Sequence, residues 1–264
     1  MAGSFQTLIR DLRLRRGRER RGLALAEGVR LIEEALATGI TFRGAAIAPA
    51  LEGTTRGKAL KAALERAGVP LEPVDDRQLA ELADTEHPQG IVAAIEPRHW
   101  TLADISTGAG SVVVVLDGVQ DPGNVGTILR TTLALGGAGL VSLKGTAELH
   151  NPKVVRGSMG ALFRLPSISV AEDEFVTWAT DRGLDLWVAE AAGKPVPTRP
   201  PAAVRPPMAL ILGSEGAGVS ATLAARATHR VGIPLAPGAE SLNVAVAAGI
   251  LLYEVRRDEV RRAD

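Results

Sequence analysis

The run from Ser111 to Asp117 constrains the fold of this chain most strongly. It reads Ser-Val-Val-Val-Val-Leu-Asp and lacks the apolar–polar alternation of a strand with one face in water. An unbroken run of β-branched residues is typical of a strand buried on both faces of a parallel sheet. Such a sheet is covered by helices on both sides, so we expect strands and helices to alternate around this run.

The sequence after residue 111 shows this alternation. We predict strands near 112–116, 138–143, 185–189, 208–212 and 229–233. We predict helices near 125–135, 152–163, 172–182, 218–227 and 241–257. This order predicts an α/β fold with a mainly parallel sheet for a C-terminal domain over 111–264. Within it, the proline-rich segment 193–207 predicts an extended loop that acts as a spacer or a lid.

The preceding residues predict a basic arm and a second, smaller domain. Residues 1–22 are rich in arginine, and we expect a short helix there, followed by a turn over Gly17–Gly22. The arm is interpreted either as a solvated terminus or as a contact for nucleic-acid phosphates. Residues 23–97 predict a small α/β domain, and 98–110 a linker. The domain's predicted helices cover 27–39 and 56–67, and its predicted strands cover 42–48, 69–74 and 90–95.

Composition excludes several classes of protein. The chain has no cysteine, which rules out disulfides, cysteine-based zinc sites and cysteine nucleophiles. The four histidines are scattered, so we predict no metal site. No apolar run is long enough to span a membrane and no signal peptide is evident, so we expect a cytoplasmic protein. The formal net charge is zero, and any binding of nucleic acid must depend on local charge.

A first polar motif begins where the 111–117 run ends. Pro122 and Gly123 predict a turn, and the side chain of Asn124 can cap the helix that follows. Ligands of open α/β sheets bind at the carboxyl ends of the strands, so we expect Asn124 and Arg130 to face a ligand. A capped helix with a surface arginine is the alternative.

A second motif, rich in glycine, occupies residues 210–218. Glycines directly after a strand let a ligand approach the backbone closely. Gly213, Gly216 and Gly218 follow one another in the reverse of the dinucleotide-binding order, which disfavours a nicotinamide cofactor. A dehydrogenase of the Rossmann type is therefore a weak alternative. Glu215 also fits a simple carboxylate at a helix terminus.

A third motif runs from Ile233 to Val244 and predicts a strand end, a loop and a helix start. Either Ser241 or Asn243 can cap the helix. A cap accounts for one of these polar residues but not for both, so the other is a candidate for function.

Together the motifs resemble the SpoU/TrmH family of RNA ribose 2′-O-methyltransferases, within the SPOUT class. The residues similar to its three motifs are Asn124-x-Gly-x-x-x-Arg130, Leu212–Gly216 and Ile233–Val244. A connecting segment of the family is similar to Asn151–Phe163, and its N-terminal substrate-binding domain is similar to Glu27-Gly28 and Pro88–Ile91. The resemblance covers nearly the whole chain.

The resemblance implies a trefoil knot in the C-terminal domain, a homodimer, S-adenosyl-L-methionine as the methyl donor, and no metal. Structured RNA would be the substrate, with 23S ribosomal RNA favoured over tRNA because the family's ribosomal members carry the added N-terminal domain. The implied catalytic residues are Asn124, Arg130, Glu215, Ser241 and Asn243. The implied cofactor contacts are Leu212, Gly213, Gly216, Ile233, Leu235 and Leu242. We expect RNA to contact Arg13, Arg15, Arg16, Arg18, Arg20 and Arg156.

Two questions follow from the resemblance. A non-catalytic RNA-binding protein would explain the arm and the N-terminal domain but not the three motifs, and binding of S-adenosyl-L-methionine separates the two interpretations.

The family sometimes assigns the arginine of its first motif as a general base. Because guanidinium is effectively always charged, we expect Arg130 to hold a phosphate and stabilise a developing alkoxide instead.

Overall fold

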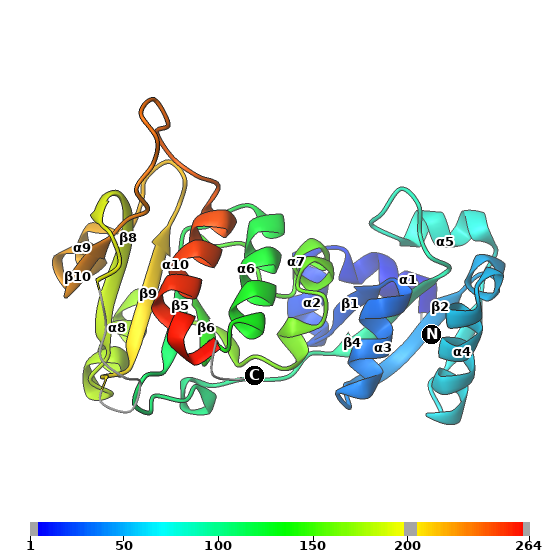
Figure 1. Ribbon diagram of the computed structural model, residues 1–264. Coiled ribbons are helices and arrows are strands. Elements are labelled where there is room, and N and C mark those ends of the chain that lie inside the picture. Colours follow the sequence, from blue (N-terminus) through cyan, green and yellow to red (C-terminus); the bar gives the residue numbers. More distant parts are fainter. Residues whose placement is uncertain (1–4, 198–204, 261–264) are drawn as a thin grey trace. The chain divides into compact units, whose positions relative to one another are not determined.

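The computed structural model describes residues 5–197 and 205–260, so the proline-rich loop predicted over 193–207 lies partly outside the described residues. The chain forms two compact units (Figure 1). The first comprises Met1–His99 and His150–Arg164, and the second comprises Trp100–Leu149 and Leu165–Asp264. No helix of the described ranges is long and apolar enough to cross a membrane.

The second unit is built on a six-stranded sheet in the order β10-β8-β9-β5-β6-β7, and all its strand pairs are parallel. Its strands are β5 (Val112–Asp117), β6 (Gly139–Ser142), β7 (Ser167–Ser169), β8 (Asp185–Lys194), β9 (Met208–Gly213) and β10 (His229–Val231). The predicted parallel sheet is confirmed. The sequence did not indicate β7, because a three-residue edge strand carries almost no hydrophobic pattern.

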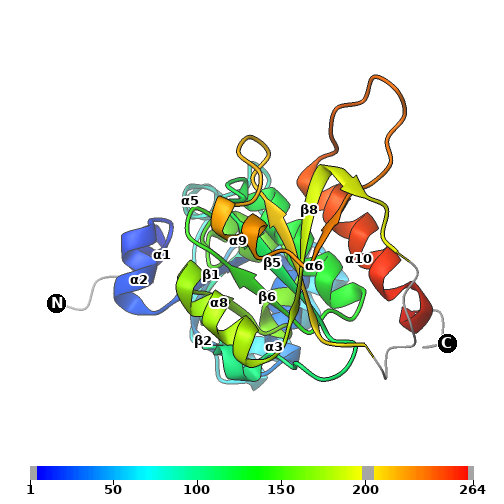
Figure 2. The same cartoon turned by 90° about the vertical axis from the view of Figure 1, so that its left-hand side faces the viewer.

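Helices cover both faces of this sheet, as the unbroken apolar run of β5 requires (Figures 1 and 2). One face carries α6 (Pro122–Ala134) and α10 (Val244–Val260), which pack on each other. The opposite face carries α8 (Glu172–Asp181) and α9 (Ala221–Ala225), and a 3₁₀ turn, η2 (Leu102–Asp104), precedes β5. Phe175 of α8 and Leu223 of α9 are fully buried against Val113, Val115 and Ile211 of the sheet.

The first unit contains a mixed four-stranded sheet in the order β1-β4-β2-β3. Its strands are β1 (Ala24–Glu27), β2 (Thr41–Ile47), β3 (Leu71–Pro73) and β4 (Ile91–Glu96). Its helices are α1 (Phe5–Leu12), α2 (Arg15–Arg21), α3 (Val29–Ala37), α4 (Thr55–Arg66) and α5 (Asp76–Leu82), with a 3₁₀ helix η1 (Pro49–Gly53). The helix expected from Glu27 starts two residues later, because Glu27 ends β1 and Gly28, at φ +97°, turns the chain.

The predicted basic arm is part of the folded first unit. Residues 17–22 do not form the predicted turn: α2 continues through Arg21 and ends at Gly22, whose φ is +64°. In α1, Ile9 and Leu12 are fully buried in the core of the unit. Phe5 and Leu8 pack against the same core, and the arginine-rich composition hid this apolar face of a short helix.

A segment that lies between β6 and β7 in the sequence belongs to the first unit. It holds α7 (Pro152–Gly157) and the 3₁₀ turn η3 (Ala161–Phe163). The single helix predicted over 152–163 is therefore wrong: Met159 and Gly160 adopt φ of +50° and +90°, which interrupts the helix. The segment is held to the rest of its unit by α7 packing on β1 and by a hydrogen bond of 2.6 Å from Arg164 to Glu34.

Candidate functional site

The carboxyl ends of β5 and β9 place two of the motifs side by side. In the parallel register Asp117 lies opposite Gly213, so the loops that follow the two strands leave the same edge of the sheet. The backbone N–H of Ser220 donates to Oδ2 of Asp117 at 2.7 Å and fastens the glycine-rich loop to the end of β5. This edge is where a parallel α/β sheet binds its ligand.

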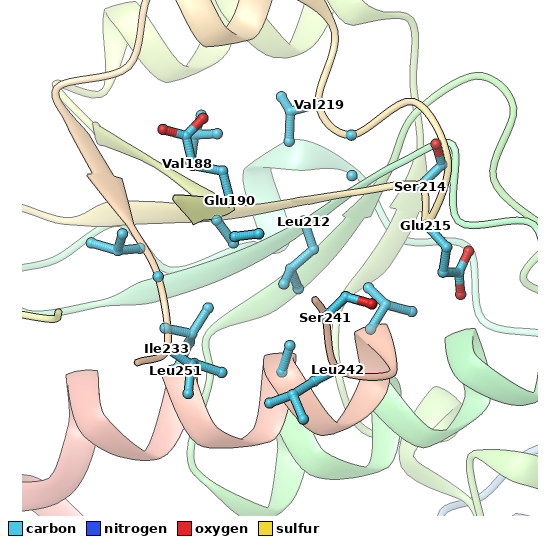
Figure 3. Close-up of a pocket in the computed structure, with 18 of the residues that line it drawn as sticks. Val188, Glu190, Leu212, Ser214, Glu215, Val219, Ile233, Ser241, Leu242 and Leu251 are labelled. Carbon is cyan, nitrogen blue, oxygen red and sulfur yellow. The ribbon is translucent and has the colours of Figure 1, made fainter. Parts of the chain in front are cut away.

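A pocket of about 560 Å³ opens at this edge, between the middle of β8, the ends of β9 and β10 and the start of α10 (Figure 3). Its size is typical of a site for a small molecule. Leu212 of β9 points into it, and Ile233, Leu242 and Leu251 lie along the wall next to α10 (Figure 3).

All six residues predicted to contact a cofactor line this pocket: Leu212, Gly213, Gly216, Ile233, Leu235 and Leu242. The pocket also has walls that the motifs did not indicate, from the middle of β8 (Val188–Ala191) and from Val231 and Gly232. The strand predicted near 185–189 was the sequence signal that could have indicated the pocket wall from β8. Nothing in the sequence indicated that β10 pairs with β8 in the sheet. The order of strands depends on contacts between distant residues.

The glycine-rich loop closes on itself next to the pocket. Ser214 and Gly218 exchange backbone hydrogen bonds of 3.2 and 3.0 Å, and Gly218 adopts φ +68°. A Cβ at Gly213 would lie 2.1 Å from the carbonyl carbon of Gly218, so this close approach requires glycine. At Gly216, by contrast, a Cβ would meet nothing within 4 Å. The loop thus holds Glu215 at its tip in a defined place.

Three polar residues from the three motifs form one hydrogen-bonded chain. Oδ1 of Asn243 accepts from the backbone N–H groups of Ala245 and Val246, at 2.9 and 3.3 Å, and so caps α10. Its Nδ2 donates to Oδ1 of Asn124 at 3.0 Å. Nδ2 of Asn124 in turn donates to Oε1 of Glu215 at 2.8 Å.

The prediction that Asn124 caps α6 is wrong. The cap is Asp121, whose Oδ1 accepts from the backbone N–H of Asn124 at 2.8 Å, with Pro122 at the first helical position. Proline suits that position because its missing N–H would have had no helical partner. The consequence is functional, because the side chain of Asn124 is left available for Asn243 and Glu215.

Two further predicted catalytic residues, Ser241 and Arg130, are exposed. Ser241 lines the pocket opposite Leu212 (Figure 3). Arg130 is exposed on α6, and no described residue forms a hydrogen bond or ion pair with it. Glu190 and Arg230 also line the pocket, where they form an ion pair of 3.0 Å.

The arginines predicted to contact RNA fall into different environments in the first unit. Arg18 is 5% exposed and donates to the carbonyls of Leu12 and Arg13, so its guanidinium serves the fold. Arg156 pairs with Asp84 at 2.9 Å.

The remaining arginines of the arm are exposed. Arg20 and Arg21 both donate hydrogen bonds to the carboxylate of Asp11. The bond from Arg21, and to a lesser extent the bond from Arg20, holds the pKa of the Asp11 carboxyl below its usual value. Arg15 pairs with Glu19, and Arg13 donates to the carbonyl of Glu81. Arg16 has no hydrogen-bond or ion-pair partner among the described residues.

The sheet, its edge pocket and the adjoining polar chain define an α/β protein with a small-molecule pocket beside a chain of hydrogen-bonded polar side chains. Residues 111–253 match the model of the SpoU rRNA Methylase family, and residues 7–93 match the model of the MRM3-like substrate binding domain. The chain therefore belongs to the SpoU rRNA methylase family, and the resemblance of its motifs is confirmed.

Relatives match over most of the chain. The 23S rRNA (guanosine(2553)-2′-O)-methyltransferase RlmP of Bacillus subtilis (strain 168) is 33% identical over 94% of this chain and 94% of its own length. The 23S rRNA (adenosine(1067)-2′-O)-methyltransferase of Streptomyces laurentii is 36% identical over 77% of this chain and 75% of its own length. The crystal structure of an AdoMet-bound rRNA methyltransferase from Sinorhizobium meliloti has a TM-score of 0.83 and 31% identity, over 98% of this chain and 96% of that one.

Proposed function

We propose that this protein transfers a methyl group from S-adenosyl-L-methionine to the 2′-hydroxyl of a ribose in 23S ribosomal RNA. The observation that carries the proposal is the chain from Asn243 through Asn124 to Glu215, which ends at the edge pocket. The relatives named above modify a guanosine and an adenosine, and the ribose is the part that these two nucleosides share. We also assign the protein to the cytoplasm, which the bacterial 23S rRNA methyltransferases among its relatives support.

The pocket fits S-adenosyl-L-methionine, which supplies an electrophilic methyl group when it is bound. Leu212, Ile233 and Leu242 offer apolar walls for the flat part of such a ligand. Gly216 leaves the backbone beside the pocket without a side chain, and nothing lies within 4 Å of its Cβ position, so a ligand can approach N–H and C=O groups there. A pocket that is shaped in advance aligns the donor for an in-line displacement.

Arg130 supports the acceptor side of the reaction in this proposal. Its guanidinium is exposed and has no carboxylate partner among the described residues. Such a group can bind the phosphate next to the target ribose and stabilise negative charge on the 2′-oxygen. Ser241, at the pocket, is available to orient the ribose.

The first unit serves as the RNA-binding part. It matches the MRM3-like substrate binding domain over residues 7–93. We assign phosphate contacts to the exposed arginines of α1 and α2, with Arg16 foremost because no described residue neutralises it. We assign Arg18 and Arg156 structural roles instead, because Arg18 donates to backbone carbonyls and Arg156 forms an ion pair with Asp84.

A homodimer is part of the proposal. Val246, Ile250 and Tyr253 form an exposed apolar stripe on α10, with exposed fractions of 51, 38 and 37%. Residues at this spacing share one face of a helix, and a second copy of the chain is the occupant that we assign to it. The trefoil knot implied by the family also remains a prediction for the second unit.

Mapping of 2′-O-methyl groups in total RNA, with and without the gene, tests the proposed function directly. We expect one 23S rRNA ribose to lose its methyl group in the deletion strain and to regain it with purified protein and S-adenosyl-L-methionine. A lost tRNA methyl group would instead assign the protein to tRNA. Failure to bind S-adenosyl-L-methionine in calorimetry would favour the alternative interpretation, a non-catalytic RNA-binding protein.

A further inference from the structure

We propose that Glu215 is the proton acceptor for the ribose 2′-hydroxyl, through its Oε2 atom. This inference rests on the proposed function and assigns a chemical step to one atom of the site. It follows from the direction of the hydrogen bonds in the chain that joins Asn243, Asn124 and Glu215.

The direction of the chain is fixed at its α10 end. Backbone N–H groups can only donate, so the amide oxygen of Asn243 must face Ala245 and Val246. The amide nitrogen of Asn243 then faces Asn124, which must present its own oxygen. Asn124 is left to present its nitrogen to Glu215, and Oε1 of Glu215 is therefore an acceptor.

The remaining oxygen of Glu215 is open. No described residue donates to Oε2, and Glu215 lies exposed at the rim of the pocket. A proton that arrives on Oε2 leaves Oε1 as a carbonyl oxygen, which still accepts from Asn124. The site therefore needs no rearrangement when the proton moves, which is the condition for efficient preorganised catalysis.

Other groups around Glu215 are less suited to take the proton. Glu190, across the pocket, has its charge matched by Arg230 at 3.0 Å. Asp117 and Asp121 accept backbone N–H groups at the ends of β5 and α6. Amides, the Ser241 hydroxyl and the Arg130 guanidinium are not bases at neutral pH.

In the step itself the 2′-O–H bond breaks, and its proton moves to Oε2 of Glu215. The electron pair left on the 2′-oxygen forms the new bond to the methyl carbon. The bond between that carbon and the sulfonium sulfur breaks, and its electron pair remains on sulfur as an uncharged thioether. Glu215 then releases the proton to water, and Arg130 stabilises the charge that develops on oxygen during the transfer.

The test compares Glu215→Gln with wild type in single-turnover methyl transfer to the mapped rRNA fragment. Glutamine keeps an oxygen for Asn124 but cannot take up a proton. We expect the rate to fall by about 10² or more, a typical effect of removing a general base. Affinities for S-adenosyl-L-methionine and for RNA should stay within about threefold, less than 1 kcal/mol. Glu174→Gln is the matched control, since Glu174 is an exposed carboxylate on α8, on the opposite face of the sheet from α6 and α10.

A pH–rate profile makes the test independent of the size of the loss. The wild-type rate should fall on acidification, because a protonated base cannot act, and the residual rate of Glu215→Gln should not. A variant rate within about threefold of wild type, or a retained acid limb, overturns the assignment. A wild-type protein that methylates no RNA ribose would refute the proposed function instead, so the two failures are distinguishable.

Discussion

Asn243 donates a hydrogen bond to Asn124 at 3.0 Å across 119 positions of sequence. The bond joins the first turn of α10 to the first turn of α6, on the same face of the sheet. Asn243 is at once the cap of α10 and the start of the polar chain that ends at Glu215. The Asn243 side chain therefore contributes both to stability and to the proposed chemistry, and different substitutions can test the two contributions separately.

Substitution of Asn243 by aspartate should reduce methyl transfer while leaving the fold nearly intact. Aspartate still caps α10, but it places an oxygen where Nδ2 donates to Asn124. We expect a rate loss of about tenfold or more from this repulsion. Asn243→Ala should additionally lower the free energy of unfolding by about 1 kcal/mol through loss of the cap. Thermal melting and single-turnover rates distinguish the two, and a wild-type rate for Asn243→Asp would contradict the role of the chain.

Substitution of Arg130 by lysine should slow methyl transfer without changing the affinity for S-adenosyl-L-methionine. Lysine keeps the charge but loses the forked donor geometry that binds a phosphate and an oxyanion together. Because Arg130 is exposed and has no described partner, the fold should not respond. We expect the rate to fall by about 10- to 100-fold. Full turnover by Arg130→Lys would remove it from the reaction.

Substitution of Arg16 by glutamine should weaken RNA binding in a salt-dependent manner. Loss of one phosphate contact lowers the slope of log affinity against log salt by about 1. Arg18→Gln serves as the contrast: its guanidinium bonds to buried carbonyls, and unfolding should become easier by about 1–3 kcal/mol. Filter binding at several salt concentrations measures the first effect and denaturant titration the second. An unchanged slope for Arg16→Gln would exclude a phosphate contact there.

Substitution of Gly213 by alanine should destabilise the second unit. The added Cβ would lie 2.1 Å from the backbone of Gly218, and backbone atoms cannot move aside cheaply. We expect a loss of about 1–3 kcal/mol in the free energy of unfolding. Gly216→Ala is the control for stability, since nothing lies within 4 Å of its Cβ position. Equal unfolding midpoints for the two variants would show that the loop does not hold the described geometry.

Substitution of Ile250 by aspartate should separate the proposed dimer into monomers. A charge placed in the centre of the apolar stripe of α10 would lose its water in the interface, at a cost of several kcal/mol. Sedimentation or light scattering measures the molecular mass. Glu174→Gln, at an exposed position of α8 on the opposite face of the sheet, should leave the assembly unchanged. A wild-type protein that sediments as a monomer would refute the dimer.

Part of the site was predictable because the signal is local. The unbroken apolar run of β5 predicts a doubly covered parallel strand, and the glycine and asparagine motifs follow predicted strand ends. A parallel sheet brings such ends to one edge whatever the order of its strands, which placed the motifs at the ligand edge. The six cofactor contacts came from the resemblance of those motifs to the family, and all six line the pocket.

Other features depend on contacts between distant residues. The sequence indicated a cap at Asn124, but a carboxylate three positions earlier takes that role in the folded chain. It also suggested an arm over the first 22 residues, whereas α1 inserts Ile9 and Leu12 into the core. In both cases a local pattern allowed several structures, and packing selected one of them.

The sequence by itself determined the two kinds of domain, the parallel sheet and the residue types at its carboxyl edge. Periodicity and glycine position are properties of neighbouring residues, and they can be recognised without a fold. Only the tertiary structure decided that Asn243 donates to Asn124 and Asn124 to Glu215. Those bonds depend on strand order, register and the capping of two helices, because only these place side chains from separate motifs within hydrogen-bond distance.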